Sequence, residues 1–229
     1  MHLNRTLFLR ATPAQRGLSL VELMVGIALG LFLVAGASTL FVSHLNNSRR
    51  LLLEARVNQD LRTAADLITR DLRRAGYWGN ALQGTVATGT SSTTVVNPYR
   101  VVTPNPGTST IAYNFSRDVA ENNTLDANEQ FGFDLTNGAI RMSINGVSQV
   151  VTDPDALTVT AFTIAPTETV VDIRDSCAST CTGGGCPTIT VRQYLLTLAG
   201  RATRDPTVTR TVQTRVRVRN DLFAGACPA

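Results

Sequence analysis

The feature that most constrains this chain is an apolar run from Leu18 to Val42, which carries a single charged residue, Glu22. Because a helix rises about 1.5 Å per residue, this run can cross a bilayer core about 30 Å thick. The residues before it include arginines and no acid, and such a basic flank favours a cytoplasmic N-terminus. We therefore expect residues 18–42 to form one transmembrane helix, followed by an exported domain.

A secretory signal peptide also has a basic start and an apolar stretch, so it is the alternative for this segment. The run is longer than the apolar region of an ordinary signal peptide. No small-residue cleavage site with a polar mature start ends it cleanly, and Val34–Ala37 is the nearest candidate. The helical pattern also continues beyond the run, which favours a membrane helix that is retained.

Beyond the membrane segment, apolar residues recur every three or four positions and predict an amphipathic helix over residues 43–76. No proline lies between Pro13 and Pro98, so none forces a kink. Gly76 follows a turn rich in arginine, which is a favourable C-terminal stop. The apolar stripe consists of Leu53, Val57, Leu61, Ala64, Ile68, Leu72 and Ala75.

After the helix the composition changes, because residues 77–229 are rich in Thr, Val, Gly, Asn and Ser. Asn137-Gly138 and Asn145-Gly146 are typical of tight hairpin turns, and residues 77–108 are expected to be a polar connector. The fold class is therefore α+β: a long N-terminal α-helix packed on a mostly antiparallel β-sheet domain. Strands are expected at 93–96, 110–115, 130–135, 138–144, 149–151, 156–164, 188–200 and 207–219.

The exported domain offers little for catalysis. The chain has two histidines, His2 and His44, and neither lies in residues 77–229. This excludes Ser–His–Asp and Cys–His catalytic sets, and any His-ligated metal, from that domain. We therefore expect no enzyme, no cofactor and no metal site. Much of the basic excess lies before Leu18, so the net charge alone does not indicate binding to nucleic acid.

A short motif, Arg16-Gly17-Leu18-Ser19-Leu20-Val21-Glu22-Leu23, spans the start of the apolar run. It resembles the type IV prepilin processing motif. The resemblance implies that residues 1–17 are a leader, that prepilin peptidase cuts between Gly17 and Leu18, and that the new amine of Leu18 is methylated. Leu18 departs from the Phe that the family usually has there. Glycine suits the cut because its backbone can lie close to a peptidase.

Glu22 is a carboxylate within the apolar run and therefore requires a partner. It would lie in the first turns of the helix, where the dipole favours an acid, close to the freed amine of Leu18. In the pilin family this glutamate is thought to attract the N-terminus of a neighbouring subunit, so the resemblance implies an assembly role. The alternative is pairing with its own amine or with a lipid headgroup.

The resemblance extends to the layout of the chain, since a long helix followed by a β-domain is the type IV pilin-like architecture. The segment Asp71–Gly79 is similar to the helix exit of PilW-type minor pilins. The implied function is that of a minor pilin in type IV pilus assembly, within a priming complex at the tip. Its implied partners are prepilin peptidase and the other minor and major pilins. Alternatives are a J-type minor pseudopilin of type II secretion, a tip adhesin or a DNA-uptake receptor.

The same resemblance implies a location. The precursor would be a single-pass protein of the inner membrane, with a cytoplasmic N-terminus and a periplasmic domain. The processed chain would then reach the pilus tip at the cell surface.

Four cysteines in the last quarter of the chain indicate disulfides in an oxidising periplasm. If residues 188–199 and 207–219 form a hairpin, its open end brings Cys186 beside Cys227 and leaves Cys177 to pair with Cys181. We favour that pairing. The second choice joins Cys177 to Cys186 and Cys181 to Cys227.

Two charged stretches remain. Arg215, Arg217 and Arg219 alternate with valines, so one face of the predicted strand is a cationic ladder. A solvated face that guards a sheet edge is the simpler interpretation, and docking of an acidic partner subunit or of DNA is the sharper one. Residues 118–129 are rich in oxygen ligands suited to calcium but lack the EF-hand pattern, so we predict a solvated acidic loop.

Overall fold

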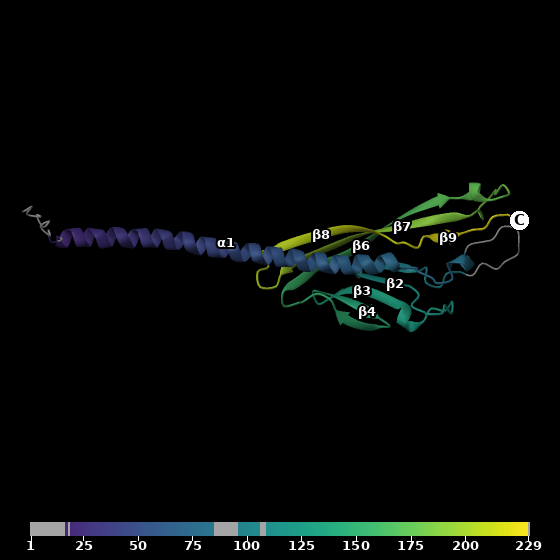
Figure 1. The fold of residues 1–229 in the computed structure, drawn as a ribbon, viewed down its shortest axis with the longest axis horizontal. Coiled ribbons are helices and arrows are strands. Elements are labelled where there is room, and N and C mark those ends of the chain that lie inside the picture. The colour runs from purple at the N-terminus through teal and green to yellow at the C-terminus, as the bar shows by residue number, and fades with distance from the viewer. Residues whose placement is uncertain (1–16, 18, 85–95, 106–108, 229) are drawn as a thin grey trace, which may run out of the picture. The chain divides into compact units, whose positions relative to one another are not determined.

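The computed structural model describes residue 17 and residues 19–84, 96–105 and 109–228. The chain divides into two compact units, residues 1–49 and 50–229. One helix, α1 (Leu20–Arg74), contributes to both (Figure 1). In the first unit every described residue is exposed. By length and composition, α1 is apolar enough to cross a membrane, as the sequence predicts.

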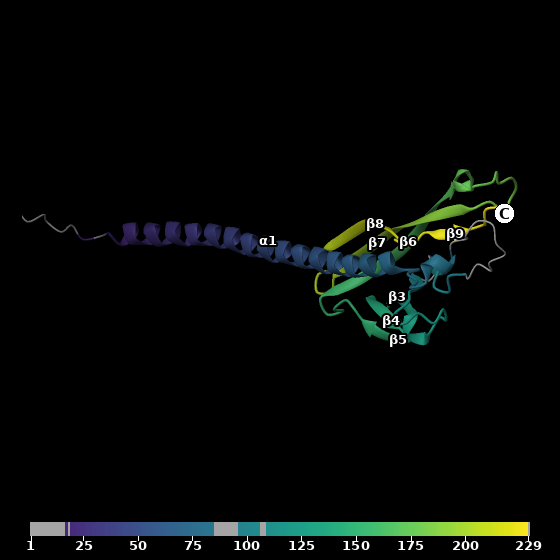
Figure 2. The same ribbon diagram turned by 45° about the vertical axis from the view of Figure 1, so that its right-hand side comes forward.

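In the second unit, α1 packs on the domain with the predicted apolar stripe. Leu61, Ile68 and Leu72 are fully buried, and Leu53 packs at the edge of the core. The stripe begins at Leu53 as predicted, and Leu51 and Leu52 before it are exposed. Two sheets supply the rest of the core, and Figures 1 and 2 show them on opposite sides of this part of α1. This helix segment therefore packs against both sheets with its buried stripe, while Arg62, Asp66 and Arg70 on its other face are exposed.

The first sheet has five antiparallel strands in sequence order. Both Asn-Gly pairs form its tight turns as predicted, with φ of 52° and 74° at Asn137 and Gly138 and of 53° and 73° at Asn145 and Gly146. The strands are β1 (Val102–Asn105), β2 (Thr110–Asn114), β3 (Gln130–Thr136), β4 (Ala139–Ile144) and β5 (Val147–Val150).

The second sheet is also antiparallel, with β7 at its centre. β6 pairs along one side of β7, while β8 and β9 pair along the other. β6 and the start of β7 extend beyond the core as a ribbon, since β6 is exposed from Ala165 onward, and β9 pairs with the end of this ribbon along β7. The strands are β6 (Leu157–Asp172), β7 (Thr188–Ala202), β8 (Thr209–Arg217) and β9 (Leu222–Ala224).

One sequence expectation for the connector is wrong. Residues 77–108 contain the short helix η1 (Ala81–Gly84) and the strand β1, although the segment lacks an alternating apolar pattern. β1 lies at a sheet edge, where a strand tolerates Pro104 and needs few buried side chains. Most of the strand expected at 93–96 lies outside the described residues. The other short helices are η2 (Ala127–Glu129) and η3 (Arg174–Ser176).

Candidate functional site

The processing motif lies at the start of α1. Gly17 is exposed, and a Cβ built on it would meet no atom within 4 Å among the described residues. Glu22 is the acid of the first helical turn, as the sequence predicts, and its side chain is exposed. Leu18, the expected new N-terminus, lies outside the described residues. Cleavage, methylation and the pairing of Glu22 therefore stay predictions.

The exit of α1 is tied to three other segments of the chain. Gly76 has a left-handed φ of 73°, and its N–H donates to the carbonyl of Asn114 at 2.8 Å. The amide of Asn97 donates to the carbonyl of Gly76 at 2.9 Å, and the amide of Asn220 donates to that of Ala75 at 3.1 Å. The segment that resembles the PilW helix exit is thus a junction between α1, β2 and the C-terminal region.

Arg192, a residue that sequence reasoning missed, lies behind this junction. It is 3% exposed and donates to the carbonyls of Arg100, at 2.6 Å, and Asn220, at 3.0 Å. Burial lowers the pKa of its guanidinium. Among the described residues, its Nε has no hydrogen-bond partner. A signal was present, because Arg192 has the same strand parity as the buried Tyr194, Leu196 and Leu198.

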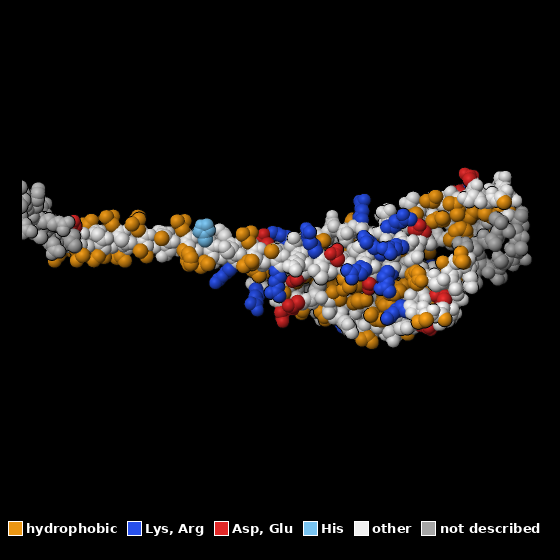
Figure 3. All heavy atoms as spheres, in the orientation of Figure 1, with side chains coloured by type: hydrophobic (Ala, Val, Ile, Leu, Met, Phe, Trp, Pro, Cys, Tyr) orange, Lys and Arg blue, Asp and Glu red, His pale blue; other side chains and the backbone are white. Residues whose placement is uncertain are grey.

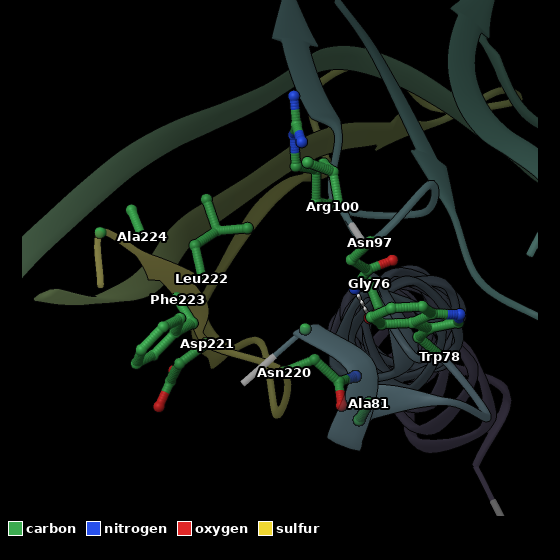
Figure 4. Close-up of a pocket in the computed structure, with 13 residues that line it drawn as sticks. Gly76, Trp78, Ala81, Asn97, Arg100, Asn220, Asp221, Leu222, Phe223 and Ala224 are labelled. Carbon is green, nitrogen blue, oxygen red and sulfur yellow. Dashed lines mark hydrogen bonds between the residues drawn. The ribbon is translucent and has the colours of Figure 1, made fainter. Parts of the chain in front are cut away.

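A cavity of about 410 Å³ lies beside the junction (Figure 4). The figure shows Trp78 and Asn97 on one side of it and Asp221–Ala224 on the other. Gly84 and Val96, which flank residues outside the described part, also line it. The indole of Trp78 donates to Asn123 at 2.9 Å, which fixes that wall. We assign no chemistry to this cavity.

All four cysteines form disulfides, but the expected pairing is wrong. The bonds are Cys177–Cys227 and Cys181–Cys186, with Cα atoms 5.4 and 5.7 Å apart. The C-terminal tail does approach Cys186, since the N–H of Ala226 donates to the carbonyl of Gly185 at 3.0 Å.

The physical reason for the different pairing is the path of the chain at the end of the ribbon. The turn η3 carries Cys177 back toward the tail, where its side chain reaches Cys227. The following loop closes on itself through the second bond. The hairpin argument placed the backbone of residue 186 correctly, but it did not determine which side chain faces the tail.

The arginine ladder has the predicted alternation. Arg215 and Arg217 are exposed, while Val216 and Val218 are buried, and β8 lies at an edge of its sheet. The arginines of the ladder differ in their contacts. Arg217 forms an ion pair with Asp221 at 2.8 Å, and the N–H of Arg219 donates to the carbonyl of Arg73 at 3.1 Å. The structure thus separates Arg219 from the ladder and brings it to the end of α1. Docking at this surface stays a prediction.

The acidic stretch 118–129 is only partly the solvated loop that the sequence predicts. Glu129 is fully buried and accepts hydrogen bonds from the N–H groups of Arg117 and Asp126, at 2.8 and 2.9 Å. Glu121 accepts from the N–H of Gly79 at 3.0 Å and from the hydroxyl of Tyr99 at 2.9 Å. The carboxylates of Glu121 and Glu129 therefore hold backbone N–H groups of neighbouring segments in place. No group of three or more possible ligands that could hold a metal lies within the described part of the chain.

Together, the apolar N-terminal helix, the processing motif and the two antiparallel sheets define a membrane-anchored type IV pilin-like protein. Two family models match the chain. Residues 12–38 match the prokaryotic N-terminal methylation motif. Residues 50–218 match prepilin peptidase-dependent protein B, and the chain belongs to this family. Comparisons with curated proteins and with solved structures gave no match. The narrower resemblance to PilW stays a prediction.

Proposed function

We propose that this chain is a minor pilin that takes part in type IV pilus assembly, within a priming complex at the filament tip. The observation that carries the proposal is that one chain contains two matched segments. They are a methylation motif over residues 12–38 and a prepilin peptidase-dependent domain over residues 50–218. The role is structural, and the chain carries no chemistry of its own.

In this proposal the precursor spans the inner membrane once, with its N-terminus in the cytoplasm. Prepilin peptidase removes residues 1–17, and the methylated amine of Leu18 begins the mature chain. Glu22 then pairs with the amine of an adjacent subunit, because a carboxylate among apolar helices requires a cation. The PilW-type assignment and the partners among minor and major pilins belong to the same proposal.

Mass spectrometry of the mature N-terminus is the first test. We expect a chain that starts at a methylated Leu18. Gly17→Trp should leave the full precursor in the membrane, because a bulky side chain keeps the peptide from the peptidase. Normal processing of that variant, or a start near Ala37, would support a secretory signal instead.

Deletion and complementation then test the filament role. Loss of surface pili on deletion, restored by the wild-type chain but not by Gly17→Trp, would support a minor pilin. A J-type pseudopilin of a type II secretion system has the same processing motif and layout. If the deletion leaves pili intact but blocks secretion of exported enzymes, that second assignment replaces the first.

A further inference from the structure

A hollow of about 270 Å³ at the C-terminal end of α1 brings together arginines that are far apart in the sequence. Arg73 and Arg74 come from the last helical turn, and Arg219 comes from the segment after β8. Tyr77 and Phe115 complete its aromatic side. Figure 3 shows arginine side chains gathered where the end of α1 lies beside β8.

Backbone contacts hold the hollow together. The N–H of Arg219 donates to the carbonyl of Arg73 at 3.1 Å, and the side-chain amide of Asn220 donates to that of Ala75 at 3.1 Å. These bonds satisfy carbonyl groups that a helix end otherwise leaves bare. They also offset the partial negative charge at this end of the helix, which would otherwise repel an anion.

The arginines of the hollow differ in their partners. The guanidinium of Arg74 lies 4.2 Å from the ring centroid of Phe115, and its Nη1 lies 3.9 Å from Oδ1 of Asp71. Arg73 and Arg219 are exposed, and no carboxylate in the described part of the chain lies within ion-pair distance of either. The fold thus presents two cations beside a third whose position is fixed.

Like charges held together repel each other, and an added anion removes that repulsion. We propose that the hollow binds a carboxylate side chain of a neighbouring pilin-like subunit, through Arg73 and Arg219. The planar fork of an arginine matches a carboxylate with two parallel hydrogen bonds. This inference rests on the proposed function, because it requires the chain to assemble with such subunits.

The surroundings favour one carboxylate over a polyanion. Arg74, which lines the hollow, is paired with Asp71, and Arg217 next to the hollow is paired with Asp221. A nucleic acid carries a negative charge about every 1.7 Å along a duplex. It would face Asp221, and the charges of Arg74 and Arg217 are already balanced by their acid partners. An Asp or Glu side chain needs to reach only Arg73 and Arg219, the arginines of the hollow that have no carboxylate partner among the described residues. The proposal therefore places docking at the hollow, where Arg219 is the one member of the ladder Arg215, Arg217 and Arg219 that takes part.

Photo-crosslinking from the rim of the hollow tests the proposal. Tyr77 is 52% exposed, and a p-benzoylphenylalanine in its place on the full chain in cells would sample the occupant. We expect an adduct with a pilin-like subunit, mapped by mass spectrometry to a segment containing Asp or Glu. Arg73→Glu with Arg219→Glu should lower the adduct yield by about tenfold or more, because like charges would then face each other. Changing the mapped acid to arginine should restore the yield.

Arg201→Glu with Arg204→Glu is the matched control. It makes the same change in net charge at exposed positions before β8, whereas Arg219 follows that strand. This pair should leave the yield unchanged. Loss of the Cys177–Cys227 bond in the charge-reversal variant, Arg73→Glu with Arg219→Glu, would indicate misfolding. In that case Arg73→Gln with Arg219→Gln, which introduces no negative charge, replaces it and should also lower the adduct yield.

Two results would overturn the proposal. One is an undiminished adduct in the reversal and glutamine pairs, and the other is an adduct that nuclease removes. Either result leaves the minor pilin role intact if pili still depend on the chain. Conversely, pili that persist after deletion would contradict the minor pilin role, whatever the adduct shows.

Discussion

The hydroxyl of Tyr113 donates a hydrogen bond of 3.1 Å to Oδ2 of Asp71, and both side chains are buried. Burial raises the pKa of the Tyr113 hydroxyl, and the charge of Asp71 raises it further. The bond joins the last turn of α1 to Tyr113 near the end of β2. Since Oδ1 of Asp71 lies 3.9 Å from Arg74, the same carboxylate also helps to position one arginine of the hollow.

Tyr113→Phe should therefore destabilise the domain. The ring remains stacked among its aromatic neighbours, but a buried carboxylate loses its donor, which costs about 1–3 kcal/mol in the free energy of unfolding. Urea unfolding of the detergent-solubilised full chain, followed by the fluorescence of Trp78, measures the change. Tyr77→Phe, at a 52% exposed position, is the control and should stay within about 0.5 kcal/mol of the wild type. Equal stability of the two variants would show that Asp71 does not depend on Tyr113.

Gly76 and Gly146 have the same φ of 73° but different surroundings. A Cβ on Gly76 would lie 3.1 Å from Nη2 of Arg192, whereas none of the described atoms lies within 4 Å of one on Gly146. Alanine in the left-handed region costs about 1–2 kcal/mol by itself. Gly146→Ala should show that cost alone.

Gly76→Ala should cost more than Gly146→Ala in the same unfolding measurement. Arg192 cannot move away freely, because its two donors hold Arg100 and Asn220. The difference between the two variants isolates the contact with the guanidinium. Equal destabilisation would mean that Arg192 adapts without cost.

The two disulfides should differ in their effect on stability. Cys177–Cys227 spans 50 residues and Cys181–Cys186 spans 5. In the loop-entropy account, replacing the first pair by serine lowers the free energy of unfolding by about 4 kcal/mol and replacing the second by about 2 kcal/mol. Peptide mapping without reduction checks the connectivity directly. A peptide that joins Cys186 to Cys227 would contradict the structure and restore the pairing first expected.

The disulfides also separate the features that the sequence predicts from those that it does not. The length of α1, the stripe through Leu61 and Ile68 and both Asn-Gly turns follow from local rules, since spacing and backbone preference determine them. The pairing of four cysteines within one short region does not follow. It depends on the direction in which η3 turns the chain, and no local pattern determines that direction.

The hollow could be predicted only in part. The alternation of arginine and valine identified Arg219 as an outward-facing cation. Its contact with Arg73 depends on where the chain goes after β8 ends, which is a tertiary relationship between residues 146 positions apart. Arg192 was missed because an arginine in a strand is usually assigned to the solvent face.

Acid should weaken the contact between Glu121 and the helix exit. Burial alone would raise the pKa of this carboxyl, but hydrogen bonds from four donors outweigh it and hold the pKa below its ordinary value of 4.5. A carboxyl with a lowered pKa stabilises the fold above its unfolded-state pKa, and this contribution is lost as the pH falls through the folded-state pKa. The donors are Ser116, Gly79, Asn123 and Tyr99.

Glu121→Gln should therefore destabilise the domain most at neutral pH. The side-chain NH2 of the new glutamine cannot accept a hydrogen bond from the donors that surround Glu121. The variant should therefore lose about 1–3 kcal/mol in the free energy of unfolding. The gap between wild type and variant should shrink as the pH falls below 4.5, because the wild-type carboxyl then gains a proton. Urea unfolding at pH 7 and at pH 3.5 measures both gaps, with the exposed Asp66→Asn as the control. A gap that stays constant with pH would show that the charge of Glu121 does not stabilise this loop.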